Sequence, residues 1–537
     1  MERNALFFLV LWVVLLYIPS ISYDFALDDA FLIVRNRYFS DGSINWWGII
    51  SEDLWSGEEH RDGISSFYRP IFLCTIAFDF LLVGLHPLWY HIHNLIWHVL
   101  CILMYWRLLH QLDLDRSQMI LAVACFGLHP INSEVVVWIS ARNDSIATCF
   151  ACCAIYFAFK NYFAVFFLSL CAYFSKESTL LLPFFIYQCL QGHQKQKISS
   201  IVSCLAIIPW FLIRYLLNIP TQLPDINHIE LFVTTLPTTI VHVLGTLLFP
   251  IDLSAVRPLA WYDLHPSAGF GCILIVVLYV LSTKRSYFWM GILCYIPVLL
   301  PISLNGIYGD RYIYLPLIWF SLWISQFYRY HRSFSIFGIV FLLFSYRISE
   351  RIPDWKNDLF VWNSEVLHSD SSYAKASLAH ILYNEGHYDT ALLYYKDAFD
   401  DDIPYLDGCA IYLSLILKKQ SPQMVIDEYH WLLDRGCEKD GLLDGVVSLA
   451  YIANQDFETA EKIVHHMQVD PSKRSDISRS VLAIRKEDWS VVCRLQDTWS
   501  DPLQFSQQLE VMLNMIGWKD KDGNSIDQAL MTKRCKK

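Results

Sequence analysis

Apolar segments alternate with short polar ones along residues 1–349. Nearly charge-free stretches cover residues 4–23, 117–133, 145–159, 161–175, 178–194, 198–213, 231–251, 266–283, 286–309, 312–328 and 333–346. Another stretch, around 88–106, is rich in His and Trp. A helix of about 20 apolar residues crosses a bilayer, and shorter stretches favour tilted or broken spans. The pattern predicts an all-α, polytopic membrane domain over 1–349 with about eleven spans.

Three of the apolar segments need separate interpretation. Residues 231–251 and 67–85 are candidates for helices that lie on the membrane surface. The first segment, 4–23, resembles a signal peptide because Arg3 precedes it and small residues end it. Its length and the many apolar segments that follow favour a retained first helix.

Basic residues fall in alternate loops between the apolar segments. They are Arg107, Arg116, Lys160, Lys195, Lys197, Lys284, Arg285, Arg329 and Arg332. Cytoplasmic loops carry an excess of Lys and Arg, so these loops and the N-terminus are predicted to be cytoplasmic. The long loop 24–87 and everything after about Tyr346 are then expected on the other side.

Residues 350–537 have ordinary polarity and predict a separate soluble domain of helical pairs. Gly386, Tyr388, Ala391, Tyr395 and Ala398 follow the tetratricopeptide pattern. A weaker copy spans 449–471, and a degenerate unit is expected around 405–437. The pattern predicts an α-solenoid that binds peptides or partners on its concave face, with an unrelated helical bundle as the alternative.

Composition supports a membrane protein and excludes one class of partner. Of the 537 residues, 55% are hydrophobic and 17% are charged, against about 25% charged in soluble domains. The formal net charge is −11 and no basic tract is present, which argues against a nucleic-acid partner.

An acidic pair, Asp28 and Asp29, follows the first apolar segment by a few residues. The predicted topology places it at the outer membrane surface. A carboxylate held there can act as a general base or bind an ion. The alternative for each acid is a solvated helix cap.

Further polar residues are predicted at the same membrane face. They are Arg69, His86, His93, His129, Glu134, Arg142, Asp144, Lys176, Glu177, Arg257, Arg311 and Tyr312. The basic members are suited to clamp a phosphate, arginine bidentately and lysine as a point charge. The acids can orient them or bind sugar hydroxyls. We therefore expect an amphiphilic, anionic substrate whose lipid tail lies between helices.

Some of these residues have simpler interpretations. Lys176 and Glu177 can pair with each other at a tight turn, and Arg311 can serve as a headgroup anchor. His91 and His98 lie seven residues apart on one helical face, but no carboxylate is close in sequence. We therefore predict no metal site.

The ordered motifs resemble the TMTC family of transmembrane and tetratricopeptide-repeat O-mannosyltransferases, within the GT-C group of glycosyltransferases. The matching elements are Leu27–Asp29, Phe67–Pro70, Gly84–Pro87, His93 with Asn94, Leu128–Pro130, Glu134, Arg142 with Asp144, Lys176 with Glu177, Arg311 with Tyr314–Pro316, and the repeats. Each motif alone is weak, whereas their order and approximate spacing agree along essentially the full chain.

The resemblance implies an inverting glycosyltransferase that uses a polyprenyl-phosphate sugar, such as mannose, on the outward face. It places the general base on Asp28 or Asp29 and the donor phosphate near Arg311. By the same analogy Arg142, Asp144, Lys176 and Glu177 belong to the donor site, and no cofactor is required. The acceptor is a protein or a glycan.

The short repeat array departs from the long arrays of TMTC proteins and is similar to bacterial relatives. This similarity favours a location in a bacterial inner membrane with periplasmic repeats. The alternative location is the membrane of the endoplasmic reticulum, with lumenal repeats. An en bloc oligosaccharide transferase is the nearest alternative function. A non-catalytic scaffold is a further alternative. A transporter would place ionisable residues deep inside the spans.

Overall fold

The computed structural model describes most of the chain. The described residues are 2–39, 43–58, 65–112, 114–220, 226–258, 266–282, 284–305, 307–329, 334–369, 371–401, 408–437, 441–466, 474–485, 488–497 and 502–516. The chain forms two compact units, Met1–Ser369 and Asp370–Lys537. Residues 350–369 therefore belong to the first unit, whereas the predicted domain boundary followed residue 349.

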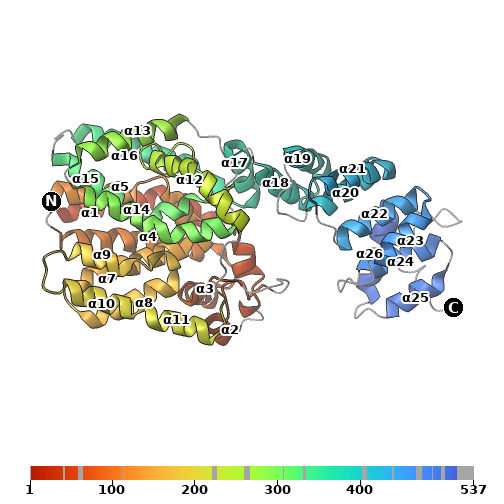
Figure 1. The fold of residues 1–537 in the computed structure, drawn as a ribbon, viewed down its shortest axis with the longest axis horizontal. Coiled ribbons are helices and arrows are strands. Elements are labelled where there is room, and N and C mark those ends of the chain that lie inside the picture. The colour runs from red at the N-terminus through yellow and green to blue at the C-terminus, as the bar shows by residue number, and fades with distance from the viewer. Residues whose placement is uncertain are drawn as a thin grey trace. The chain divides into compact units, whose positions relative to one another are not determined.

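The first unit is a bundle of helices (Figure 1). In chain order they are α1 (Glu2–Tyr17), α2 (Trp46–Ser51), α3 (Pro70–Val83), α4 (Pro87–Leu109), α5 (Arg116–Gly127), α6 (Asn132–Val137), α7 (Arg142–Ala158), α8 (Tyr162–Ser175), α9 (Leu182–Cys189), α10 (Gln196–Leu205), α11 (Ile207–Leu216), α12 (Ile226–Thr246), α13 (Pro266–Leu281), α14 (Arg285–Asn305), α15 (Tyr314–Ser325), α16 (Phe334–Arg351) and α17 (Asp358–Ser369). Two strands of two residues each, β1 (Arg257–Pro258) and β2 (Ile307–Tyr308), pair antiparallel.

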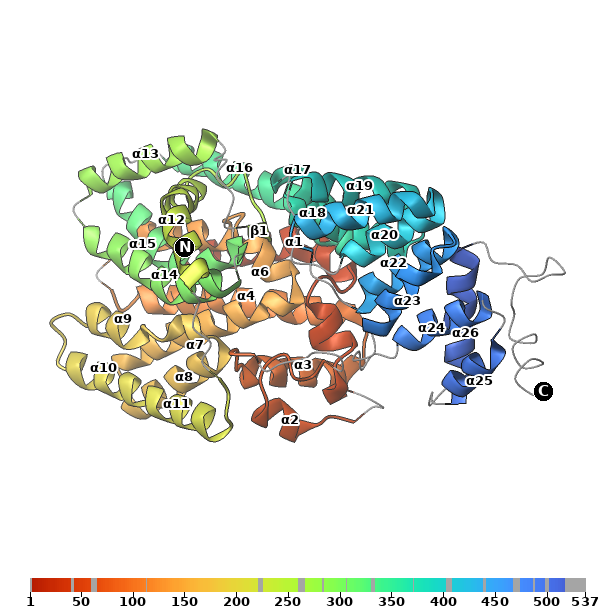
Figure 2. The same cartoon turned by 45° about the vertical axis from the view of Figure 1, so that its right-hand side comes forward.

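Helix α4 lies at the centre of this unit and contacts α5, α6 and α7. Buried polar bonds from His98 and Tyr105 tie it to α15. His98 Nδ1 lies 2.7 Å from the Tyr314 hydroxyl, and the Tyr105 hydroxyl donates to the Ile318 carbonyl at 2.8 Å. Helices α7, α8 and α10 lie side by side in both Figure 1 and Figure 2. Most of the apolar segments thus share one packed core, and a second, smaller cluster lies between α3 and the loop after α1.

The predicted all-α class is confirmed. Within the described residues, 3 helices are long and apolar enough to cross a membrane: Asn4–Ser22, Pro87–Leu109 and Gln196–Leu216. Several other apolar helices are shorter, among them Tyr162–Ser175 and Pro266–Leu281. The count of about eleven spans and the GT-C-like bundle therefore stay predictions.

The shorter helices are interrupted by polar turns. Helix α8 ends at Ser175, and a 3₁₀ turn, Glu177–Thr179, precedes α9. A second 3₁₀ turn, Asp310–Ile313, follows β2 and leads into α15. Because α8 ends and α15 begins at such turns, their ionisable residues gather at helix ends.

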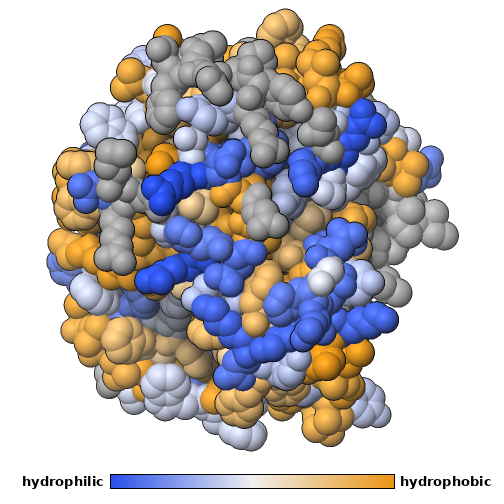
Figure 3. Space-filling model, turned by 90° about the vertical axis from the view of Figure 1, so that its left-hand side faces the viewer, coloured by the Kyte–Doolittle hydropathy of each residue, from blue (hydrophilic) through white to orange (hydrophobic). Residues whose placement is uncertain are grey.

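Two of the predicted cytoplasmic loops lie together. Lys195 Nζ donates to the carbonyl of Lys160 at 2.7 Å, which joins the loop after α7 to the loop before α10. Figure 3 shows hydrophilic residues gathered on the end of the first unit where the N-terminus lies, with hydrophobic residues around them. The cytoplasmic location of these loops stays a prediction.

The second unit consists of short helices joined by turns. They are α18 (Ser372–Asn384), α19 (Tyr388–Asp401), α20 (Gly408–Lys419), α21 (Pro422–Asp434), α22 (Gly441–Ala453), α23 (Phe457–His466), α24 (Arg474–Arg485), α25 (Trp489–Asp497) and α26 (Pro502–Met515). Successive helices pack as pairs, α18 with α19, α20 with α21, and α22 with α23.

The tetratricopeptide-like residues of the first pair have the expected structural roles. Gly386 has a φ of +85°, a conformation that glycine adopts without steric cost, in the turn between α18 and α19. Ala391, Tyr395 and Ala398 are buried in the helical core. Cys409 and Cys437 form a disulfide that closes the second pair. The solenoid arrangement of the pairs stays a prediction.

Candidate active site

The acidic pair lies on a loop that follows the 3₁₀ turn Ile18–Ser22 at the end of α1. Asp29 is 1% exposed, and both of its carboxylate oxygens are occupied. Oδ1 accepts hydrogen bonds from the backbone N–H of Ser140, at 2.8 Å, and from its hydroxyl. Oδ2 accepts the Ala26 N–H at 3.1 Å. Asp29 therefore fastens this loop to the turn that precedes α7.

Burial raises the pKa of Asp29 to about 7, although the hydrogen bonds from Ser140 and Ala26 lower it. These donors stabilise the charged form of a carboxylate that has almost no solvent contact. Asp29 is thus too enclosed to meet a substrate hydroxyl without losing the contacts that hold its loop.

Asp28 differs from its neighbour in exposure and in surroundings. Its side chain is half-buried, and its negative charge is among those that raise the pKa of Arg311. The preceding residue, Leu27, has a φ of +53°. A leucine rarely adopts this left-handed conformation, which costs about 1–3 kcal/mol and is found mostly where function requires a fixed geometry.

Arg311 comes from the 3₁₀ turn before α15 and is clamped by Glu134. Its backbone N–H and its Nη1 donate to the two Glu134 oxygens at 2.9 and 2.6 Å. Nη1 also donates to the Ala255 carbonyl at 3.0 Å. The guanidinium lies over two rings, with its Cζ 5.0 Å from the Trp138 centroid and 4.8 Å from that of Tyr312.

This clamp leaves part of the guanidinium available. Arg311 is 17% exposed, and no acceptor among the described residues takes a hydrogen bond from its Nε or Nη2. Burial alone would lower the pKa of Arg311, but the nearby Tyr312, Glu134 and Asp28 raise it overall. The residue is therefore a permanent cation whose Nε and Nη2 donors have no acceptor in the part of the chain that the structure describes.

Two further ion pairs join α3, α7 and the turn after α8. Arg69 precedes α3 and donates from Nε and Nη2 to both oxygens of Glu177, with an Nε distance of 3.1 Å. Lys176 Nζ donates to Asp144 at 2.6 Å. Lys176 and Glu177 thus bind different partners, and the simpler interpretation in which they pair with each other is wrong.

Tyr312 connects the two groups of charges. Lys176 Nζ lies 5.3 Å from the centroid of its ring, and the Arg311 guanidinium lies over the same ring. Burial lowers the pKa of Lys176, although Asp144 raises it. The structure thus brings Asp28, Glu134, Asp144, Lys176, Glu177, Arg69, Arg311 and Tyr312 into one polar region.

Arg142 is placed differently from the other predicted donor residues. Its side chain is 0% exposed and its Nη1 donates to Asp79 Oδ2 at 2.5 Å. Nε donates to Asn94, and Nη2 donates to the carbonyl of Tyr90. His93 contacts the other Asp79 oxygen at 2.6 Å. Arg142 and His93 therefore brace α3 against α4 and α7, and these partners of their side chains lie outside the polar region around Arg311.

Two predicted histidines lie outside the polar region. His86 is exposed at the start of α4. His129 is buried, with Nε2 3.1 Å from the Leu247 carbonyl and Nδ1 accepting the Ile131 N–H. Arg257 forms an ion pair with Asp252 at 3.0 Å.

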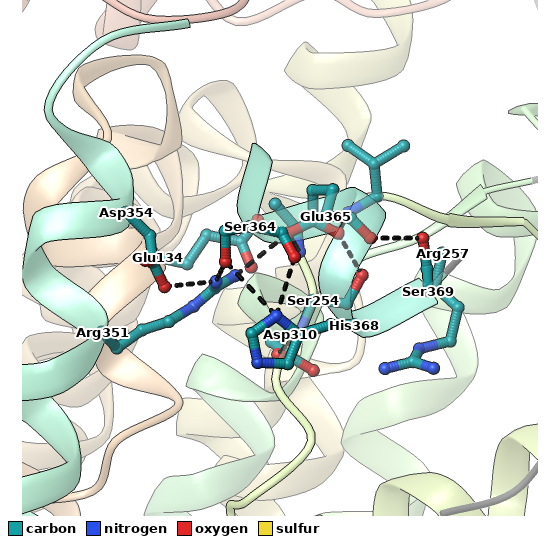
Figure 4. A network of polar contacts seen from close by, with 12 residues as sticks. Glu134, Ser254, Arg257, Asp310, Arg351, Asp354, Ser364, Glu365, His368 and Ser369 are labelled. Carbon is teal, nitrogen blue, oxygen red and sulfur yellow. Dashed lines mark hydrogen bonds and ion pairs between the residues drawn. The ribbon is translucent and has the colours of Figure 1, made fainter. Parts of the chain in front are cut away.

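Several residues that support the site escaped the sequence analysis, namely Asp79, Trp138, Ser254, Arg351, Asp358 and Glu365. Asp79 could have been noticed in the sequence, because it is the single acid inside the apolar helix α3. Figure 4 shows Glu365 and Ser254 in a network that also contains Glu134, Arg351 and Asp310. Nothing in the sequence indicated this network, since residues after 349 were predicted to belong to the repeat domain.

A metal ion has no obvious place in the described part of the chain. No group of three or more His, Cys, Asp or Glu side chains there could hold one. That the protein needs no metal stays a prediction.

Fold and site together define an all-α membrane protein whose ionisable residues cluster at helix ends. Curated relatives carry the name protein O-mannosyl-transferase. Human TMTC1 is 30% identical over 152 residues, which is 28% of this chain and 16% of TMTC1. Mouse TMTC2 is 31% identical over 25% of this chain and 16% of its own length. The Caenorhabditis elegans protein F38B6.6 is 28% identical over 30% of this chain and 23% of its own length.

These relatives confirm the resemblance to TMTC proteins over the matched part of the chain. The matched part spans less than a quarter of each of these relatives. No family model matches the chain, and no solved structure matches it.

Proposed function

We propose that this protein is a membrane glycosyltransferase that moves a hexose, by analogy mannose, from a polyprenyl phosphate to a hydroxyl group of a protein. The relatives named O-mannosyl-transferases support the sugar and the kind of acceptor. The polar region at the helix ends supports a donor with an anionic headgroup and an apolar tail.

The proposed reaction is a single displacement. Asp28 takes the proton of the acceptor hydroxyl, whose oxygen attacks the anomeric carbon. The bond from that carbon to the phosphate oxygen breaks, and the leaving polyprenyl phosphate keeps the electron pair. Arg311 neutralises the charge that develops on the phosphate, and the anomeric centre is inverted.

The observation that carries the proposal is the neighbourhood of Asp28 and Arg311. The loop of Asp28 and the guanidinium of Arg311 both contact Trp138, whose Nε1 donates to the Ala26 carbonyl at 3.1 Å and whose ring centroid lies 5.0 Å from the Arg311 Cζ. Asp28 is half-buried, and Nε and Nη2 of Arg311 have no acceptor among the described residues. A transferase of this kind needs one base for the acceptor and one cation for the phosphate. Arg69 and Lys176 supply further positive charge, each held by its own carboxylate.

For location, we infer the endoplasmic reticulum membrane with the second unit in the lumen. The curated relatives come from animals, which favours this alternative over a bacterial inner membrane. The Cys409–Cys437 disulfide supports an oxidising compartment for the second unit. We further propose that the second unit engages the acceptor protein.

Arg311→Lys should lower kcat/KM by about 10- to 100-fold, because one charge-assisted hydrogen bond is worth about 1.5–3 kcal/mol. Lysine keeps a charge opposite Glu134 but loses the planar fork that holds a phosphate bidentately. The assay follows transfer of radiolabelled mannose from dolichyl phosphate mannose to protein in purified membranes.

The matched control is Arg37→Lys, since Arg37 forms an exposed ion pair with Glu52 at 2.6 Å in the loop after α1. It should retain wild-type transfer. Equal activity of the two variants would contradict the proposed role of Arg311 in binding the donor phosphate. Transfer only from a polyprenyl-pyrophosphate oligosaccharide would favour an en bloc transferase, and inactivity with both donors would favour a scaffold.

Cys409 and Cys437 should be resistant to maleimide in intact cells until a reductant is added. In a lumenal second unit both thiols are oxidised, so reduction should add to the gel shift that a mass-tagged maleimide produces with the free cysteines of the chain. The double variant with serine at both positions should lose this reductant-dependent part of the shift. Full labelling of the pair before reduction would contradict the lumenal location.

A further inference from the structure

Helix α17 carries two carboxylates, Asp358 at its start and Glu365 seven residues later. A separation of seven residues places them on one side of the helix. Asp358 is half-buried, and Glu365 is 0% exposed. Both side chains contact segments far away in the sequence. Asp358 contacts the loop that holds Asp28, and Glu365 contacts the 254–255 turn, which in turn contacts Arg311.

Asp358 holds the loop of the proposed base. Its Oδ1 accepts the N–H of Leu27 at 2.6 Å, directly before Asp28. A second bond, from the N–H of Asp24 to the Lys356 carbonyl at 3.1 Å, fixes the start of the same loop. Leu27 has the left-handed φ of +53°, which needs such support because it is sterically unfavourable.

The cap of α17 does not depend on Asp358. The side chain of Asn357 accepts the N–H of Phe360 at 3.2 Å and so satisfies a donor in the first turn. Helix α17 therefore does not need the contact between Asp358 and Leu27 for its own N-terminal cap. The contact instead stabilises the conformation of the loop that holds Asp28.

Glu365 holds the turn that orients Arg311. Its Oε1 accepts the Ala255 N–H at 2.9 Å, and its Oε2 accepts the Ser254 hydroxyl at 2.5 Å (Figure 4). The Ala255 carbonyl in turn accepts Nη1 of Arg311 at 3.0 Å. Arg351 donates to Glu365 Oε1 at 3.1 Å and compensates its buried charge.

We propose that α17 is a positioning helix that sets the separation between Asp28 and Arg311 through Asp358 and Glu365. The base and the phosphate cation belong to different segments, a loop after α1 and a turn before α15. Helix α17 binds the loop directly and reaches Arg311 through the 254–255 turn, so a change at either carboxylate displaces one partner relative to the other. This inference rests on the proposed function, and neither carboxylate is itself a catalytic residue.

The two ends of the helix should give different kinetic defects. Asp358→Ala should lower kcat on the order of 10²-fold, the cost of a small misplacement of a reacting group, with the donor KM nearly unchanged. Glu365→Gln should raise the donor KM by about tenfold, because one acceptor of the 254–255 turn is lost. Asp358→Asn keeps an oxygen for the Leu27 N–H and should restore most of the kcat.

The control is Glu350→Gln, a carboxylate near the end of α16 that is 44% exposed. It should leave kcat and KM unchanged. A merely structural role would lower the amount of folded protein in both α17 variants without separating kcat from KM. Equal kinetics for Asp358→Ala and wild type would overturn the inference.

Hydrogen exchange tests the inference independently of activity. Asp358→Ala should speed amide exchange in residues 24–35, and Glu365→Gln should speed it in residues 252–256, each without affecting the other segment. If the wild type transfers no sugar, the proposed function fails, while this segment-specific pattern still supports positioning. Unchanged exchange in both segments would refute α17 as the positioning helix.

Discussion

Asp28→Asn is expected to lower sugar transfer on the order of 10³-fold, within the range that a general base contributes. Asparagine has nearly the same shape but cannot accept the proton of the acceptor hydroxyl. The variant should fold like the wild type, because Asp28 is half-buried and the loop is fastened through Asp29. The measurement compares initial rates and thermal unfolding of the two purified proteins.

Asp29→Asn provides the contrast within the same pair. Its amide would place N–H groups against donors from Ser140 or Ala26, where the carboxylate accepted from both. We expect a loss of about 1–3 kcal/mol in the free energy of unfolding, the cost of unsatisfied buried groups. If Asp29→Asn removed activity without loss of stability while Asp28→Asn remained active, Asp29 would be the base.

The helical segments of the first unit could be predicted because each follows from local composition. The predicted segment 161–175 corresponds to α8, Tyr162–Ser175, and 266–283 corresponds to α13, Pro266–Leu281. Apolar runs between polar residues fix where a helix can start and end. Their lengths did not fix the number of membrane crossings, since many helices are shorter than a straight span.

The sequence allowed us to predict which ionisable residues lie at the candidate site, but not which residues they pair with. Charged residues at the ends of apolar segments are visible in the sequence, as with Lys176 and Glu177. Their pairing is not, because Glu177 binds Arg69 across 108 residues of sequence and Lys176 binds Asp144 across 32. Such pairs depend on how helices pack, which periodicity alone does not determine.

The carboxylates of α17 illustrate the same limit more strongly. Asp358 contacts Leu27 across 331 residues, and Glu365 contacts Ser254 across 111. Their local sequence resembles that of an ordinary amphipathic helix before a repeat domain. Only the fold shows that α17 belongs to the first unit and that its buried side carries the acids.

Removal of one partner from the buried pair of Arg142 and Asp79 should strongly destabilise the first unit. Both side chains are 0% exposed, and they lie 2.5 Å apart where α3 meets α7. His93 contacts the same carboxylate at 2.6 Å. Arg142 holds α4 as well, through the side chain of Asn94 and the carbonyl of Tyr90. The pair thus connects α3, α4 and α7.

Asp79→Ala should lower the free energy of unfolding by about 3–5 kcal/mol, because it leaves an uncompensated buried guanidinium. Adding Arg142→Met to this variant should recover part of the loss, since replacing both charges removes the desolvation cost. Thermal unfolding in detergent of the single and double variants measures the coupling. The matched control is the exposed ion pair of Arg37 and Glu52. Glu52→Ala should lower the free energy of unfolding by no more than about 1 kcal/mol. A double variant as unstable as the sum of its single variants would show that Arg142 and Asp79 act independently, and the brace would then consist of apolar packing between the helices.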